Sequence, residues 1–79
     1  VRFVLRGTSV EATAAREVIL SGGSFNSPQL LQLSGVGPGA HLQALGIPVV
    51  SDSPGVGTGL QDHFYVRTVW KCTRPMTFN

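Results

Sequence analysis

The chain has 79 residues, which is enough for one small domain or for a piece of a larger one. Charged residues make up 13% of it, about half of the roughly 25% that is usual in soluble domains, and the formal net charge is only +2. This weak charge disfavours a nucleic-acid-binding protein, and the single cysteine excludes an internal disulfide bond.

The charges are also unevenly distributed. No Asp, Glu, Lys or Arg occurs from Val18 to Ser51, which predicts an interior segment covered by other protein. Polar residues, Gly and Pro interrupt each apolar run well short of the about 18 residues of a membrane span, so we expect no transmembrane segment and a cytoplasmic location. The chain begins with Val1 and its only methionine is Met76, which predicts a fragment.

The first third of the chain predicts a hairpin and a buried strand. Residues 1–6 and 10–15 alternate between apolar and polar, with Gly7-Thr8-Ser9 as the turn between two strands. Val18-Ile19-Leu20 is a continuous apolar run that ends at Ser21-Gly22-Gly23. Such a run is typical of a strand that is buried on both faces of a parallel sheet.

Two short helices are predicted next. The first begins at Ser27-Pro28, because a serine oxygen can cap free N–H groups and proline suits the first turn, and it ends at Gly35. The apolar contacts of this helix come from Leu30, Leu31 and Leu33. The second helix runs from Pro38 to Gly46, with Leu42 and Leu45 on one face.

The last third predicts strands around a loop. A short strand over residues 47–50 precedes a Gly/Pro loop at 53–59, and residues 64–72 alternate as a strand. Cys72 is interpreted as a small buried hydrophobe rather than as a nucleophile. The basic residues near the C-terminus are interpreted as a solvated edge: Arg67, Lys71 and Arg74.

The glycine clusters raise the question of a nucleotide-binding loop. Residues 35–40 fit G-x-G-x-x-A, but a leucine-rich helix precedes them where the motif needs a strand, and Pro38 removes one N–H donor. Residues 55–59 have the wrong glycine spacing. Ser21-Gly22-Gly23 is the better neighbour for a phosphate or nucleotide, since it follows the predicted buried strand. A tight turn without a ligand explains the same residues equally well.

Residues 23–37, GSFNSPQLLQLSGVG, resemble the second signature of the glucose–methanol–choline oxidoreductases. That signature has a small pair, Ser/Thr-Pro, paired aliphatic residues and then Ser-Gly-aliphatic-Gly, and each fixed position is filled here. The resemblance covers about residues 16–63. It continues through further pieces in the family's order: Pro38, His41-Leu42, residues 45–50, residues 54–57 and Leu60-Gln61-Asp62-His63.

The resemblance implies an α/β fold and an oxidoreductase. Residues 1–63 would be the C-terminal part of a doubly wound FAD-binding domain, and residues 64–79 would begin the substrate domain with an antiparallel strand. Family members oxidise an alcohol by passing a hydride to the flavin, which implies FAD as cofactor and a small-molecule alcohol as substrate. Val66-Arg67 and Thr77-Phe78-Asn79 resemble choline dehydrogenase-like members, which favours a choline-like substrate. The electron acceptor is not indicated.

The same resemblance implies where the cofactor lies. The small residues Ser21, Gly22, Gly23 and Ser24 would keep the backbone thin beside FAD, and Asp62 and His63 would lie on the cofactor side. Neighbours along a strand point to opposite faces, so Asp62 and His63 are not predicted to form a catalytic acid–base pair. The family often has Asn or His where this chain has Gly59, which removes one contact that could position the flavin.

No catalytic residue and no metal site is predicted in this chain. In the family the catalytic bases lie beyond the position of Asn79, and the glycine-rich FAD-phosphate motif precedes the matched residues. His41 and His63 are too far apart in sequence to predict a local metal pair. We therefore expect the chain alone to be inactive. Two alternatives stay open: a small, independently folded interaction module, and the product of a truncated gene.

Overall fold

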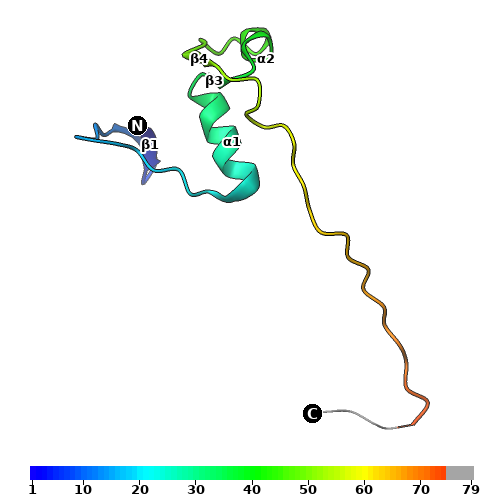
Figure 1. Cartoon of the computed structure of the whole chain (residues 1–79). Coiled ribbons are helices and arrows are strands. Elements are labelled where there is room, and N and C mark those ends of the chain that lie inside the picture. The colour runs from blue at the N-terminus through cyan, green and yellow to red at the C-terminus, as the bar shows by residue number, and fades with distance from the viewer. Residues whose placement is uncertain (75–79) are drawn as a thin grey trace.

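The computed structural model describes residues 1–74, and within that range it contains two helices and two two-stranded sheets (Figure 1). The chain forms a hairpin, continues into a long helix and folds into a compact segment. It then extends away from these elements as a tail. The elements are, in order, β1 (Arg2–Leu5), β2 (Thr8–Glu11), α1 (Gly23–Leu33), β3 (Val36–Gly37), α2 (Gly39–Ala44) and β4 (Ser51–Asp52).

The predicted hairpin is confirmed, with a shorter second strand than expected. β1 and β2 pair antiparallel, and Arg2 lies opposite Glu11. The turn consists of Arg6 and Gly7, with φ of 50° and 82°, rather than of Gly7-Thr8-Ser9. Two consecutive positive φ values are the geometry of a two-residue hairpin turn, and they let β2 begin at Thr8.

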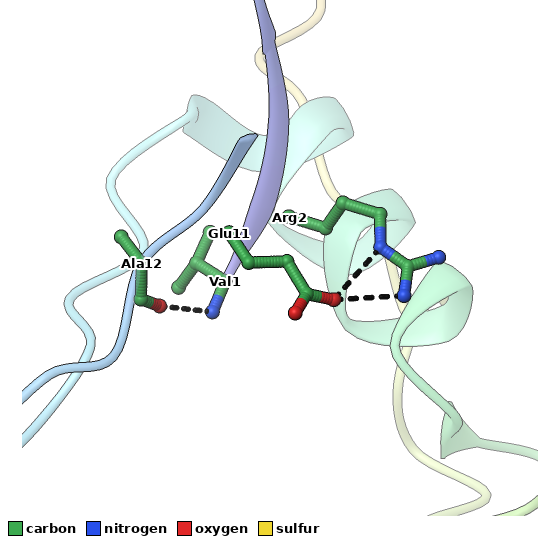
Figure 2. A network of polar contacts seen from close by, with 4 residues as sticks. All are labelled: Val1, Arg2, Glu11 and Ala12. Atoms are coloured by element: carbon green, nitrogen blue, oxygen red, sulfur yellow. Dashed lines mark hydrogen bonds and ion pairs between the residues drawn. The ribbon is translucent and has the colours of Figure 1, made fainter. Parts of the chain in front are cut away.

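Polar contacts at the open end of the hairpin join its two strands (Figure 2). The Arg2 guanidinium donates to Glu11 Oε1 from Nη2 at 2.8 Å and from Nε at 3.1 Å. The amino group of Val1 donates to the carbonyl of Ala12 at 2.7 Å. Both charged side chains are mostly exposed, so water screens the Arg2–Glu11 pair and limits its contribution to stability.

The predicted buried strand at Val18-Ile19-Leu20 is wrong for this structure. Residues 12–22 form no strand, and the Ile19 side chain is 77% exposed. A strand needs neighbouring backbone to satisfy its N–H and C=O groups, and residues 1–74 place no strand beside this segment. The apolar run therefore lies uncovered in the described part of the chain.

Helix α1 begins at Gly23, four residues before the predicted start. Pro28 lies inside the helix rather than in its first turn. The Ser27 hydroxyl does not cap a helix that starts beside it; its Oγ accepts the backbone N–H of Gly22 at 2.9 Å. The bond holds the residue just before α1 against the helix. The predicted end is confirmed, since α1 stops at Leu33 and Gly35 follows with φ +86°.

Residues 32–57, here called the packed segment, contain the best-packed part of the described chain. β3 and β4 pair in parallel, and the Val50 N–H donates to the Gly35 carbonyl at 2.8 Å. Leu42, on the helix α2 between them, is fully buried. The strand predicted at residues 47–50 is displaced, because the ladder forms only at Ser51–Asp52.

Residues 58–74 run as an extended tail without regular structure, so the predicted strand at 64–72 is wrong here. Phe64 is 95% exposed and Trp70 85%, and Cys72, predicted to be buried, is exposed. The tail and the uncovered 12–22 segment give a radius of gyration of 21.1 Å. A compact chain of this length has about 12 Å. The residues Thr77-Phe78-Asn79 lie outside the described part.

Candidate functional site

A hollow of about 450 Å³ lies between one face of α1 and the loop that follows β4. The helix supplies Phe25, Pro28, Gln29 and Gln32, which repeat at the three- and four-residue spacing of one helical face. The loop lies on the opposite side of the hollow and contributes, among others, Val56, Gly57, Thr58 and Leu60.

The Gln32 side chain joins the helix and the loop that line the hollow. Its Nε2 donates to the Val56 carbonyl at 3.0 Å, in a partly buried position. Two glycines make room for it. A Cβ on Gly57 would lie 2.6 Å from Nε2, and a Cβ on Gly37 would lie 2.9 Å from Gln32 Cγ. Both distances are shorter than real carbon contacts, so any larger residue would have to displace the glutamine.

The predicted cofactor residues Ser21, Gly22, Gly23 and Ser24 lie together at the start of α1, and all four are exposed. Of these, only Ser24 lines the hollow. Pro28 has no N–H, so the Ser24 carbonyl lacks the helical donor four residues on that it would otherwise have. Gly23 has φ +86°, and nothing lies within 4 Å of where its Cβ would be.

Asp62 and His63 lie at the beginning of the extended tail, and no hydrogen bond among residues 1–74 joins them to the start of α1. Asp62 Oδ1 accepts the backbone N–H of His63 at 2.8 Å. This contact involves the backbone of His63 and not its imidazole. Gly59, three residues before Asp62, has φ +68°, a left-handed conformation that glycine adopts readily.

The structure supports the rejection of the glycine stretch at 35–40 as a phosphate loop. A Cβ on Gly35 would clash with the Pro48 carbonyl, so its space is taken by protein. The Gly39 N–H already donates to Asp52 Oδ1 at 2.8 Å. A carboxylate at that position would repel a phosphate, because two anions at such a distance disfavour each other.

Most residues that line the hollow were not predicted from the sequence. The helical spacing of Phe25, Pro28, Gln29 and Gln32 was the available signal, but this face mixes polar and apolar side chains. The sequence instead predicts that Leu30, Leu31 and Leu33 make the apolar contacts of the helix, although Leu30 and Leu33 are exposed. The loop across the hollow has no period that would have revealed its position.

A sequence model of the family described as GMC oxidoreductase matches residues 1–65. The chain belongs to the GMC oxidoreductase family. The match covers most of the chain and includes the hairpin, both helices and all of the predicted cofactor residues, up to His63. The resemblance inferred from the signature at residues 23–37 is thus confirmed at the level of the family.

Similar curated proteins carry the name choline dehydrogenase. The chain is 54% identical over 79 residues to "Choline dehydrogenase, mitochondrial" of Homo sapiens and 52% identical to the protein of that name in Mus musculus; each match covers 100% of the chain and 13% of the relative. It is 57% identical over 68 residues, or 86% of the chain, to "Oxygen-dependent choline dehydrogenase" of Pseudomonas putida, covering 12% of that protein. The chain therefore spans only a small part of these relatives.

No solved structure matches the chain significantly. Within residues 1–74, no helix is long and apolar enough to cross a membrane. The same range contains no group of three or more His, Cys, Asp or Glu side chains placed to hold a metal ion.

Proposed function

We propose that this chain is a segment of an FAD-dependent oxidoreductase that oxidises choline or a choline-like alcohol by hydride transfer to the flavin. The observation that carries the proposal is the 52–57% identity to relatives named choline dehydrogenases, together with the family match over residues 1–65. In this proposal, residues 1–63 belong to the FAD-binding domain and residues 64–79 begin the substrate domain.

The residues at the start of α1 fit a nucleotide cofactor. No side chain caps the helix at Gly22, and its first turn contains no acidic residue that would repel a phosphate. The open space at Gly23 leaves the backbone accessible, and the Ser24 carbonyl can accept a hydrogen bond. These are the backbone features that a dinucleotide needs at a close approach.

Backbone and hydroxyl groups would hold FAD at Ser21, Gly22, Gly23 and Ser24. Asp62 and His63 would bind it from the far side of the loop at residues 53–58. When bound, FAD supplies the acceptor for the hydride that leaves the alcohol carbon. No residue of this chain is assigned the role of the base. The contribution of the chain is to bind and orient the cofactor, so the chain alone is expected to have no activity.

The names of the relatives bear on the cellular location, and the exposed apolar side chains bear on the interaction-module alternative. The names of the human and mouse relatives include the word mitochondrial, whereas the name of the Pseudomonas putida relative gives no location. A cytoplasmic location of this chain stays a prediction. The interaction-module alternative requires the chain to cover its own apolar surface. The exposed side chains Ile19, Phe64 and Trp70 favour the oxidoreductase segment instead.

A graft tests the proposal. In the graft, this chain replaces the matching 79 residues of the Homo sapiens choline dehydrogenase. We expect the graft to retain bound flavin and to oxidise choline at a rate within about tenfold of the parent protein, a loss of about 1.4 kcal/mol in transition-state stabilisation. A folded graft that holds no flavin would contradict the proposal. The matched control replaces the same residues with a scrambled sequence of equal composition.

A further inference from the structure

We propose that Gln32 is a positioning residue: it fixes the turns at residues 53–58 against α1 and so sets the direction in which the chain leads to Asp62 and His63. Gln32 lies between the paired leucines and the Ser-Gly of the signature, outside its fixed positions, and the sequence pattern assigns it no role. The consequence for the flavin rests on the proposed function, whereas the structural part of the inference does not.

The first observation is the hydrogen bond across the two segments. Gln32 Nε2 donates to the Val56 carbonyl at 3.0 Å, and 24 residues separate the two partners along the chain. Among the side-chain hydrogen bonds within residues 1–74, this one spans the greatest sequence separation. It lies in a partly buried position, so losing the donor would leave the Val56 carbonyl with poor access to water.

The second observation is the space around the glutamine. Gly37 is buried and lies against Cγ, while Gly57 lies against Nε2. Gly57 also has φ +84°, a conformation that other residues rarely adopt. Two glycines from different parts of the chain thus leave the space that the Gln32 side chain occupies.

The third observation is that the loop can transmit this constraint. Within it, the Val56 N–H donates to the Ser53 carbonyl at 3.1 Å and the Thr58 N–H donates to the Gly55 carbonyl at 3.3 Å. Thr58 Oγ1 also donates to the Gly55 carbonyl, at 3.0 Å. These bonds join residues 53–58 into two successive turns, so holding Val56 holds the whole loop. The extended tail begins directly after it.

The experiment compares two variants at this position with a matched control. Gln32→Leu removes the hydrogen bond but keeps a side chain of similar bulk, and Gln32→Glu keeps the shape while replacing the donor with an acceptor. Gln43→Leu is the control, since Gln43 is exposed on α2 and has no side-chain hydrogen bond within residues 1–74.

Amide hydrogen exchange of Ser53 and Val56, whose N–H groups donate to the Gly37 and Ser53 carbonyls, is the primary measurement, made on the isolated chain and on the graft. We expect Gln32→Leu and Gln32→Glu to raise the exchange rate of these amides about fivefold, as expected for the loss of one hydrogen bond, and Gln43→Leu to leave it unchanged. Equal exchange in the Gln32 and Gln43 variants would overturn the proposal.

Flavin binding by the graft is the second measurement. We expect both Gln32 variants to weaken FAD binding about fivefold and to change the flavin absorption spectrum, because Asp62 and His63 are displaced while the start of α1 is untouched. A graft that binds no flavin with Gln32 intact would contradict the proposed function, and the exchange rates would still decide the role of Gln32. Normal flavin binding and spectrum in both Gln32 variants would overturn the positioning role toward the cofactor.

Discussion

The packed segment and the tail at residues 58–74 have a similar share of apolar residues, yet only the packed segment has a local structure. In the packed segment, helix α2 follows β3 directly, and close glycines let β4 and the loop lie against them. In the tail, successive residues face solvent with no neighbouring backbone. Apolar content alone therefore does not decide which part of this chain folds; access to backbone partners does.

This difference suggests how the chain is stabilised. The packed segment depends on contacts between residues close in sequence, such as the Ile47 N–H and the Leu42 carbonyl at 2.9 Å. Residues 18–20 and 64–72 have the composition of strands, but strands gain stability only from a sheet. They lie within the unpaired segments 12–22 and 58–74. We infer that these two segments become ordered within a larger domain, while the packed segment forms locally.

The largest expected effect comes from Leu42→Ala. Leu42 is the one fully buried side chain among residues 1–74, and its truncation would leave a cavity at the centre of the packed segment. We expect a loss of about 3 kcal/mol in the local unfolding free energy, measured by amide exchange of α2 in the graft. Leu45→Ala is the control, because Leu45 is exposed and its loss should cost below about 0.5 kcal/mol. Equal effects would contradict the packing described here.

The second effect separates two costs of replacing a glycine: the clash of a new Cβ with neighbouring atoms and the strain of a positive φ. Gly35→Ala places a Cβ against the Pro48 carbonyl at φ +86°, whereas Gly46→Ala meets open space at φ +71°. We expect about 2 kcal/mol of destabilisation for the first and about 1 kcal/mol for the second, in the same exchange measurement. If the two variants behave alike, residues 48–50 do not lie as close to Gly35 as the structure places them.

A smaller effect is expected at the contact between β4 and α2. Asp52→Ala removes the acceptor of the Gly39 N–H and the negative charge beside the start of α2. A loss of about 1 kcal/mol should appear as faster exchange in α2. Asp52→Asn keeps an acceptor oxygen and should retain most of that stability. An Asp52→Asn variant as unstable as Asp52→Ala would mean that the charge, not the hydrogen bond, is responsible.

The smallest effect is expected in the hairpin. Arg2→Ala removes an ion pair to Glu11 between two mostly exposed side chains. We expect a change of about 0.3 kcal/mol that disappears at high salt, measured by exchange of the β1–β2 amides with and without 1 M NaCl. A salt-independent loss would indicate that the aliphatic part of Arg2, rather than its charge, holds the strands together.

How much of the fold could be predicted varies with the range of the interactions. The hairpin, the helix ends at Gly35 and Gly46 and the rejection of a phosphate loop followed from local chemistry, and the structure supports each of them. The strands at 18–20 and 64–72 failed because a strand is defined by its neighbours, and the described residues provide none. The start of α1 was missed because Pro28 was placed in the first turn.

The candidate site shows the same limit. The signature at residues 23–37 led to the family, which the comparison confirmed. The structure places Ser24 beside the hollow, which the signature did not predict. The role of Gln32 could not be inferred from the sequence, since it depends on a carbonyl 24 residues away. It also depends on Gly37 and Gly57, whose missing side chains leave room for the glutamine. The cofactor roles of Asp62 and His63 stay predictions.

Amide exchange of the chain in two contexts tests the central claim most directly. The isolated chain and the graft are compared residue by residue, with the graft placing the same sequence inside the human relative. We predict that residues 35–52 exchange more slowly than their flanks in both contexts, whereas residues 12–22 and 58–74 are protected only in the graft. Equal protection of those two segments in the isolated chain would contradict the account, because the chain would then cover its own apolar surface.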